Sequence, residues 1–514
     1  MKKKIRLKNA DALVTTTGRS ALWQIIGGGW QTIVRLGASV FLARALTPRD
    51  FGLFGMAMIA QEFISYMGAL GVNAGVIAKK DVADDDVYTC FWIVAGMRFI
   101  MFLMGFFGAP LIAIVFNEPQ LVSIARAVSG VFLISIVRAI PETLLDKGAR
   151  FATLNIIFGI STILESILAL GLAVWARAGL WSLVAAMYVG AVFQGVTIVI
   201  VAGWTPKLRF SRQSFNYLYK FGVHGLGFSI TNYLSQNLDY LLVGRILGAQ
   251  ALGLYEFSYR MPHLVLDRIA RPVGVVIFPA LSRVNENDEL LAAGYLKTVK
   301  FVCLLTFPFL AGLAAVADVA VPLVWGDKWI PIIVPLQILC LCAALRCPTQ
   351  PTGPIFYCKQ RPDLPFKIAA STLAFTAIFV AFLGYWFGVT GVALGMLLSV
   401  VPSYSSVFFV MKLTATPLSR FVITLLPMGM CSLVCATVAL VTKKLFLFAG
   451  VNYPCALTSA ILSGMIVYPL AILFLFPGLA CEIVDVLESV VGRALPWLQF
   501  VARSGKKITK QGVQ

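Results

Sequence analysis

Long apolar stretches separated by short polar breaks follow one another along almost the whole chain. Each is close to the length of about 20 residues that an α-helix needs to cross a lipid bilayer. Because the bilayer interior offers no water, each backbone amide and carbonyl must find a partner inside its own segment, which favours helices. The pattern predicts an all-α polytopic membrane protein with about 14 transmembrane helices.

The predicted helices form two groups of six and a final pair. They cover residues 21–45, 51–77, 88–116, 121–144, 153–175 and 179–203, then 217–247, 251–281, 298–324, 331–357, 366–387 and 391–413, and last 421–446 and 455–477. The expected organisation is a cytoplasmic basic tail (1–20), an N-terminal lobe (21–203), a cytoplasmic linker (204–216), a C-terminal lobe (217–413), two additional helices (421–477) and a second cytoplasmic basic tail (478–514).

The two groups of six begin with related sequences. ARALTPRDFGLF aligns without a gap on GRILGAQALGLY, which places Arg44, Leu46, Gly52, Leu53 and Phe54 on Arg245, Leu247, Gly253, Leu254 and Tyr255. Internal repeats are frequent in transporter folds. The alignment favours an internal duplication, although a common way of ending one membrane helix and starting another would produce the same pattern.

Composition and charge agree with a membrane protein. Of the 514 residues 59% are hydrophobic and 13% charged, and the mean hydropathy is +0.87. This excludes a soluble globular protein. The net charge of +19 does not indicate nucleic-acid binding, because many lysines and arginines lie in alternate loops and in both tails. That asymmetry predicts that both termini are cytoplasmic, with Lys443 and Lys444 among the few cations in outside loops.

Enzyme and metal chemistry find little support in the chain. The ten cysteines include no CxxC pair, and several, such as Cys303, Cys340, Cys342, Cys431 and Cys435, lie in apolar segments where we expect small buried residues. Gly27, Gly28 and Gly29 lack the lysine and serine that complete a nucleotide loop, and Asp84, Asp85 and Asp86 are typical of a solvated helix start. We therefore predict no enzymatic activity, no cofactor and no metal.

Arginines recur at depths where lipid is expected. An ionisable group there costs about 2.5 to 3.5 kcal/mol, so it faces protein or water. Basic residues outnumber acidic ones, which leaves net positive charge in the interior. The planar guanidinium suits phosphate because it donates two parallel hydrogen bonds. The predicted cationic substrate-binding cavity consists of Arg35, Arg98, Arg138, Arg260, Arg268, Arg271 and Arg346.

Some charged residues have simpler interpretations. Asp267 and Arg271 are four residues apart on one helix and could neutralise each other. Arg44 and Arg245 lie near helix ends, where long side chains reach the membrane surface. The candidates for ion coupling are Glu62, Asp239 and Asp267. Asp239 belongs to a polar stripe with Asn232, Gln236 and Asn237 that suits a cation, a sugar or contacts between helices equally well.

The tenth predicted helix contains CPTQPTGP, with Pro348, Pro351 and Pro354. Each proline removes a backbone hydrogen bond, so this helix must kink or open, and we predict a hinge there. The fourth helix has a fainter version, Arg138 followed by Pro141. Broken helices at corresponding positions of two halves indicate a substrate path in transporters.

Three runs resemble one known family. LDYLLVGRILGAQALGLYEFSYRM, VIFPALSR and WGDKWIPIIVPLQIL are similar to the Wzx-type polysaccharide flippases, as is the opening FLARALTPRDFGLFGMA. These belong to the superfamily of multidrug, oligosaccharidyl-lipid and polysaccharide exporters. The resemblance covers residues from about 20 to 410. The matched positions are Asp239, Arg245 and Arg260; one departure is Gln360, where relatives tend to have glycine.

The resemblance implies two six-helix lobes related by a pseudo-twofold axis along the membrane normal, around a central cationic cavity. It also implies a flippase that moves a polyprenyl-diphosphate-linked oligosaccharide across the bacterial inner membrane by alternating access, for exopolysaccharide, lipopolysaccharide or capsule synthesis. The partners to consider are membrane lipid, a polysaccharide polymerase and glycosyltransferases, and a proton or sodium ion.

Three alternatives predict different features. A cation-coupled multidrug exporter of the same superfamily would need an acidic cavity, which the excess of arginine disfavours. A membrane-embedded glycan polymerase would need a large outside loop, and the outside connections are short. A scaffold that transports nothing would not need arginines within the membrane.

Overall fold

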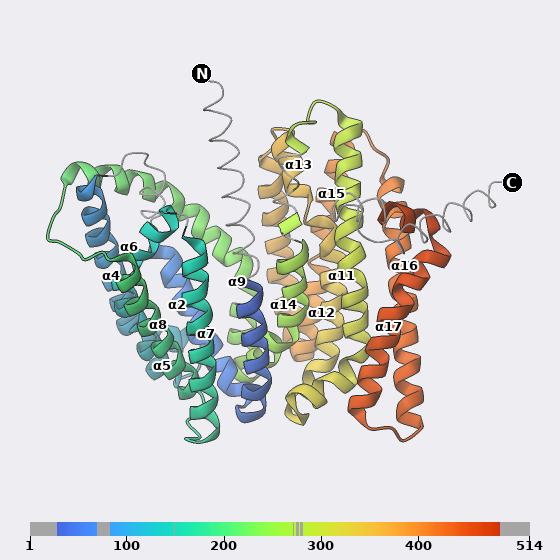
Figure 1. The fold of residues 1–514 in the computed structure, drawn as a ribbon, viewed down its shortest axis with the longest axis horizontal. Coiled ribbons are helices and arrows are strands. Elements are labelled where there is room, and N and C mark those ends of the chain that lie inside the picture. The colour runs from blue at the N-terminus through green and yellow to red at the C-terminus, as the bar shows by residue number, and fades with distance from the viewer. Residues whose placement is uncertain are drawn as a thin grey trace. The chain divides into compact units, whose positions relative to one another are not determined.

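The computed structural model describes residues 28–68, 83–148, 150–270, 272–273, 277 and 281–483, without the side chains of 217–232 (Figure 1). Within these ranges every regular element is helical. Nine helical stretches among the described residues are long and apolar enough to cross a membrane. The predicted all-α, multi-pass architecture is confirmed.

The chain divides into two compact units, Met1–Gly253 and Leu254–Gln514. The first unit contains a helix over 28–45, α2 (Pro48–Gly68), α4 (Asp84–Phe116), α5 (Leu121–Ser129), α6 (Val131–Lys147), α7 (Phe151–Val174), α8 (Trp181–Ala202) and most of α9 (Arg212–Val265). The lobe and linker boundaries stay predictions, and the two terminal tails lie outside the described residues.

The second unit begins within α9 and continues to the end of the chain. It contains the π-helical turn η1 (Leu266–Ala270), α11 (Asp288–Trp325), η2 (Asp327–Ile332), α12 (Ile333–Arg346), η3 (Cys347–Thr349), α13 (Thr352–Cys358), α14 (Asp363–Leu398), η4 (Val401–Ser403), α15 (Tyr404–Leu413), α16 (Leu418–Phe448) and α17 (Tyr453–Leu475).

Two long helices are each interrupted by a glycine. The 54 residues of α9 would measure about 81 Å, against a hydrocarbon layer of about 30 Å. Gly248 interrupts α9 with a φ of 82° and a ψ of −177°, and Gly388 interrupts α14 with a φ of 59°. Glycine takes these angles without a steric penalty from a Cβ. Both interruptions fall where the sequence separates two predicted spans.

The related sequences pack against each other in a reciprocal way. A Cβ on Gly52 would lie 1.7 Å from the backbone oxygen of Ala249, and a Cβ on Gly253 would lie 1.9 Å from that of Pro48. The alignment places Pro48 on Ala249 and Gly52 on Gly253. Each repeat therefore contributes a glycine against which the backbone of the other repeat packs. This symmetry supports the predicted internal duplication.

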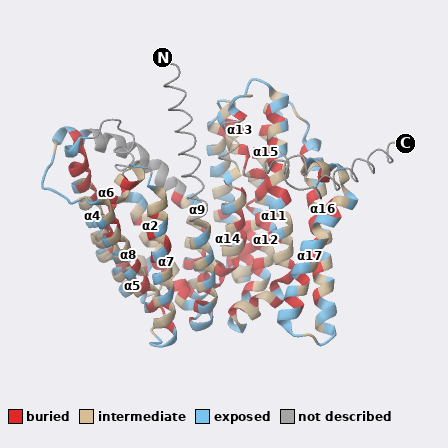
Figure 2. Cartoon of the chain, viewed as in Figure 1, coloured by how far each residue is buried: buried red, intermediate tan, exposed pale blue. Residues whose placement is uncertain are grey.

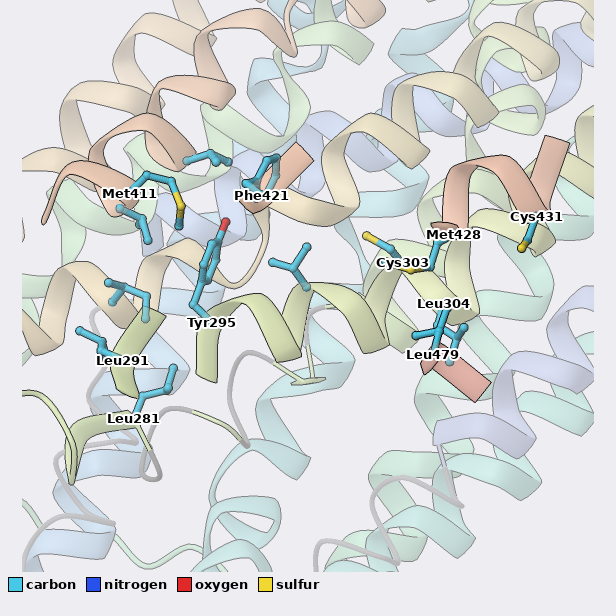
Figure 3. Close-up of a cluster of buried hydrophobic side chains, with 14 of the residues drawn as sticks. Leu281, Leu291, Tyr295, Cys303, Leu304, Met411, Phe421, Met428, Cys431 and Leu479 are labelled. Carbon is cyan, nitrogen blue, oxygen red and sulfur yellow. The ribbon is translucent and has the colours of Figure 1, made fainter. Parts of the chain in front are cut away.

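The second unit has a continuous apolar core (Figure 3). Tyr295 of α11 is fully buried, and its ring lies parallel to that of Phe421 in α16 at 6.5 Å between centroids. Met411 of α15 and Cys431 of α16 are buried in the same cluster. Cys303, Cys340, Cys342, Cys431 and Cys435 are all buried, as the sequence predicted.

The surfaces of the last two helices are suited to lipid. Large apolar side chains such as Leu433, Leu462 and Met465 are exposed on α16 and α17, where Figure 2 shows broad pale blue areas. In water such surfaces would favour aggregation. In a bilayer they face acyl chains, and this agrees with a membrane-spanning position for both helices.

The assignment of Lys443 to an outside loop is wrong. Lys443 lies inside α16 and is 2% exposed. Its ammonium donates hydrogen bonds to the carboxylate of Asp318 at 2.6 Å and to the carbonyl of Ala315 at 2.7 Å, both on α11. A buried lysine must be paired, so this ion pair ties α16 to α11. The sequence alone could not reveal Asp318 as the partner.

The departure at Gln360 also has a structural explanation. Gln360 has a φ of 54°, and it follows α13 in a Schellman arrangement, with Arg361 N–H bonded to Phe356 O at 2.9 Å and Gln360 N–H to Tyr357 O at 3.1 Å. Glycine adopts this left-handed conformation most easily. A family preference for glycine here follows from the backbone, and glutamine keeps the same turn.

The reciprocal glycine contact leads to a first prediction. Gly52→Ala and Gly253→Ala should each lower the thermal unfolding midpoint in detergent by several degrees, because overpacking costs about 1 to 3 kcal/mol and the blocking atoms belong to the backbone. Gly37→Ala is the matched control, since a Cβ there meets nothing within 4 Å. Equal midpoints for all three variants would contradict the close packing.

Candidate functional site

Four helices of the first unit bring polar side chains together at membrane depth. Arg138 of α6 donates a hydrogen bond to the amide oxygen of Gln194 on α8. The amide nitrogen of Gln194 then donates to the hydroxyl of Ser161 at 2.8 Å and approaches the carboxylate of Glu165 at 3.4 Å, both on α7. The Ser161 hydroxyl donates to Glu165 at 2.8 Å. Helices α6, α7 and α8 are thereby linked through one chain of hydrogen bonds.

Arg98 of α4 adds a second guanidinium to this region. It donates a hydrogen bond to the hydroxyl of Ser135 on α6, one turn before Arg138. The charge of Arg98 interacts with the charges of Arg138 and Glu142. We call the set formed by Arg98, Ser135, Arg138, Glu142, Ser161, Glu165 and Gln194 the polar network.

The polar network does not satisfy Arg138 completely. Among the described residues, its buried Nε has no hydrogen-bond partner, and the nearest carboxylate oxygen, on Glu142, lies 3.6 Å away. Guanidinium nitrogens usually bond fully when buried, because an unmade hydrogen bond there costs about 1 to 3 kcal/mol. Arg138 therefore retains the capacity to bind a further acceptor, such as an anionic oxygen.

Glycine makes room for the carboxylate of the network. A Cβ on Gly190 of α8 would lie 1.9 Å from the Glu165 Oε1 atom. The Ser161 hydroxyl also lies 3.3 Å from the carbonyl oxygen of Gly190. Glu165 thus packs directly on the α8 backbone, which positions it for Gln194 one turn further along.

In the second unit the predicted arginines have different partners. Arg260 binds the carboxylate of Glu256 at 2.7 Å and its guanidinium stacks 5.1 Å from the ring centre of Phe257. Arg346, at the end of α12, donates to the hydroxyl of Ser399 at 3.1 Å. Arg260 is therefore largely neutralised by an acid, whereas the Ser399 hydroxyl that Arg346 contacts carries no charge.

The remaining candidates that the structure describes lie on other helices. Arg35 is exposed on the helix over 28–45, and Glu62 is exposed on α2. Asp239 is 4% exposed on α9. Arg268 is exposed on η1, and Arg271 lies outside the described residues.

The predicted pairing of Asp267 with Arg271 involves a residue that lies outside the described ones. Asp267 instead has a described partner one turn earlier, since its carboxylate lies 3.2 Å from the Nε2 atom of His263. The two residues are four apart on one helical face. A role for Asp267 in ion coupling stays a prediction.

The proline run opens its helix as predicted. Helix α12 ends at Arg346, a 3₁₀ turn holds Pro348, and α13 begins only at Thr352. The hydroxyl of Tyr295 lies 3.3 Å from the Pro348 carbonyl that the break exposes. By contrast, α6 continues through Pro141, and it meets α5 at Gly130, whose backbone angles are helical. Within the described ranges, a proline break is therefore present in the second half and not in the first.

Sequence reasoning missed several members of the polar network. The candidates that the sequence indicates do not include Ser135, Glu142, Ser161, Glu165 and Gln194. Gln194 had a visible signal, because an amide inside the apolar run of α8 must find a partner. Pairing it with Arg138, 56 positions away, required the tertiary structure.

The fold is that of known membrane transporters. It resembles a solved structure of the lipid II flippase MurJ in an inward closed conformation, with a TM-score of 0.72 over 89% of this chain and 99% of that chain, at 16% identity. A weaker likeness, with a TM-score of 0.54, is to an inward-facing multidrug resistance MATE family transporter of the MOP superfamily, over 75% of this chain and 95% of that chain at 16% identity. These likenesses define a class of fold.

Sequence comparison shows the family within that class. Residues 41–334 match the family described as polysaccharide biosynthesis protein, and the chain belongs to this family. It is 28% identical to the lipopolysaccharide biosynthesis protein WzxC of Escherichia coli K12, over 75% of this chain and 80% of that protein. It is 26% identical to the teichuronic acid biosynthesis protein TuaB of Bacillus subtilis 168, over 67% of this chain and 72% of that protein.

The contact between Gly190 and Glu165 yields a second prediction. Gly190→Ala should displace Glu165, break its hydrogen bonds with Ser161 and Gln194, and reduce polysaccharide export in cells by about tenfold or more, since about 1.4 kcal/mol corresponds to a factor of ten. Gly195→Ala on the same helix is the control, because its Cβ would meet only the Ile134 oxygen, at 3.9 Å. Normal export by Gly190→Ala at matched protein level would show that the network is dispensable.

Proposed function

We propose that this protein is a flippase that moves polyprenyl-diphosphate-linked oligosaccharide repeat units across the bacterial inner membrane, for exopolysaccharide, lipopolysaccharide or capsule synthesis. Family membership supports a role in polysaccharide biosynthesis. Relatives include the succinoglycan biosynthesis transport protein ExoT of Rhizobium meliloti, 23% identical over 61% of this chain. The names of such relatives describe transport and biosynthesis proteins, and we infer no enzymatic activity of this chain.

The choice of partners for Arg98 and Arg138 carries the proposal. The hydrogen-bond partners of both guanidinium groups, Ser135 and Gln194, are neutral. A neutral partner does not cancel the positive charge of the guanidinium. A phosphate oxygen can displace that partner, because its charge-assisted hydrogen bond is shorter and stronger. Arg138 also lies 3.6 Å from Glu142, whereas Arg260 lies closer to its acid, at 2.7 Å from Glu256. The polar network of the first unit is therefore our preferred site for the diphosphate.

The other predicted components extend this proposal. Arg35, Arg268, Arg271 and Arg346 would add positive charge along the path of the diphosphate, while the sugars occupy water and the polyprenyl chain stays in lipid. Glu62, Asp239 and Asp267 stay candidates for coupling to a proton or sodium ion. We also infer an inner-membrane location with both termini in the cytoplasm, on the basis of the loop charges.

A multidrug exporter is the second candidate function. The likeness to a MATE family transporter supports only the shared fold. Glu142 and Glu165 could attract a cationic drug, but Arg98 and Arg138 lie in the same network and oppose it. The two arginines and two glutamates balance in charge, so our preference for an anionic substrate comes from the Arg138 Nε, which has no hydrogen-bond partner among the described residues.

Loss of either network arginine is the direct test. In liposomes that contain the purified protein and a fluorescent polyprenyl-diphosphate oligosaccharide, Arg98→Gln and Arg138→Gln should each slow label translocation about tenfold to a hundredfold, because hydrogen bonds to charged groups contribute about 1.5 to 3 kcal/mol. Translocation is measured as the label that an impermeant quencher reaches.

Arg126→Gln is the matched control for this experiment. Arg126 is an exposed arginine of α5 over the Phe106 ring, and it takes no part in the polar network. Arg138→Lys should retain part of the activity, because lysine keeps the charge without the planar fork. Unchanged translocation in both glutamine variants would refute the diphosphate site, and no translocation by the native protein would refute the flippase.

We further propose that the break between α12 and α13 is a hinge of alternating access. Replacing Pro348, Pro351 and Pro354 together with alanine lets the two helices join, since alanine restores the missing N–H groups. The same liposome assay should then show slower translocation with little loss of thermal stability. Pro427→Ala is the control, because α16 continues through Pro427 without a break. A native translocation rate in the triple variant would refute the hinge proposal.

A further inference from the structure

The segment between α8 and α9 lies against the beginning of α4. The backbone carbonyl of Lys207 accepts a hydrogen bond from the indole of Trp92 at 3.1 Å. The backbone N–H of Ser211 donates to the hydroxyl of Thr89 at 2.9 Å. These contacts fix the middle of the segment over the first two turns of α4. We call residues 204–214 the strap.

Both ends of the strap are also attached. The ring of Trp204 stacks on Tyr88 at 5.7 Å and contacts Phe91 at 5.5 Å. The hydroxyl of Ser214 donates to the carboxylate of Asp86 at 2.7 Å. Asp86 is 3% exposed and its other oxygen accepts the Ala83 N–H at 3.0 Å, so it caps α4 and holds the strap together. The expectation of a solvated acidic cluster is wrong for Asp86.

The outer side of the strap combines apolar and basic residues. Leu208 is 91% exposed and Phe210 is 60% exposed, although their backbone is held in place. Lys207, Arg209 and Arg212 are exposed between and beside them. A loop in water seldom presents two such apolar side chains on a fixed backbone. Their alternation with cations is typical of a segment at a membrane surface.

The position of the strap along its helices matches the membrane surface. Helix α8 has 22 residues, or about 33 Å, which spans the hydrocarbon layer of about 30 Å, and the strap begins two residues after its end at Ala202. Tyr88, Trp92 and Trp204 gather at the same level. Tyrosine and tryptophan are enriched where hydrocarbon meets the headgroups.

From these observations we propose that the strap anchors the first unit to anionic phospholipid headgroups of the leaflet on its side. Leu208 and Phe210 insert among the upper acyl carbons, while Lys207, Arg209 and Arg212 bind lipid phosphates. The anchor holds the segment that connects α8 to α9 at the membrane surface. This role is independent of what the protein transports.

A lipid surface fits these cations better than the diphosphate of a single substrate molecule. Arg209 lies 4.0 Å from Asp85 and 6.0 Å from the Tyr88 ring, and Lys207 lies 6.0 Å from the same ring. Arg209 is still 57% exposed by side chain. Lys207 and Arg209 approach the same ring but stay exposed, and Arg212 is exposed further along the strap, an open arrangement that suits several headgroups rather than one bound phosphate.

A spin label at Leu208 tests the anchor directly. In the full chain, Cys358, Cys455 and Cys481 are changed to serine so that the seven buried cysteines alone remain, and Leu208→Cys is labelled. The protein is placed in vesicles of phosphatidylcholine, with or without phosphatidylglycerol. Electron paramagnetic resonance then compares collisions of the label with oxygen, which dissolves in lipid, and with a water-soluble nickel complex.

We expect the Leu208 label to favour oxygen collisions, and to do so more strongly in the vesicles that contain phosphatidylglycerol. Asn285→Cys, an exposed loop position of the second unit, is the matched control and should favour nickel collisions in both vesicles. Lys207→Gln together with Arg209→Gln should abolish the effect of phosphatidylglycerol. Gel filtration verifies that each variant is folded.

Two outcomes would overturn the anchor. A Leu208 label that collides mainly with nickel in both kinds of vesicle would place the strap in water. Complete reversal of the phosphatidylglycerol effect by inorganic pyrophosphate would indicate a site for a diphosphate headgroup instead. Both readouts are independent of translocation, so they do not depend on the proposed flippase function.

Discussion

Close packing at two glycines is the constraint on which the first unit depends. Gly52 admits the backbone of Ala249, and Gly253 admits the backbone of Pro48, at distances that leave no space for a methyl group. Because equivalent positions of the repeat exchange this contact, the start of α2 and the kinked middle of α9 hold each other. Helix α4 also packs on α9 near this junction, since a Cβ on Gly244 would lie 2.8 Å from the Phe116 ring.

The chemistry of the site depends on how closely each arginine is paired with an acid: Arg138 lies 3.6 Å from Glu142, and Arg260 lies 2.7 Å from Glu256. Tertiary packing gives Arg98 and Arg138 a hydroxyl and an amide as hydrogen-bond partners, and it gives Arg260 a carboxylate. Residues that look alike in the sequence therefore differ in how much charge they can offer a ligand. The same reasoning applies to Lys443, a cation that Asp318 neutralises and that serves packing instead of binding.

Helix α4 connects the two proposals for the first unit. Its middle carries Arg98 in the polar network, and its first turns carry Asp86, Thr89 and Trp92, which hold the strap. An anchored strap would hold the start of α4 at the membrane surface, while its middle contributes charge to the site. Helix α4 thus links the proposed membrane anchor to the proposed binding site.

The sequence by itself determined the class of protein, the positions of most membrane helices, the repeat and the break at the prolines, because apolar length, glycine and proline act locally. It placed Arg98 and Arg138 among the candidates for the same reason, since a charge at membrane depth is visible in one segment. Only the tertiary structure decided the partners, such as Gln194 for Arg138, Asp318 for Lys443 and Ser214 for Asp86. Such pairs join residues far apart in the chain, and their geometry depends on how whole helices pack.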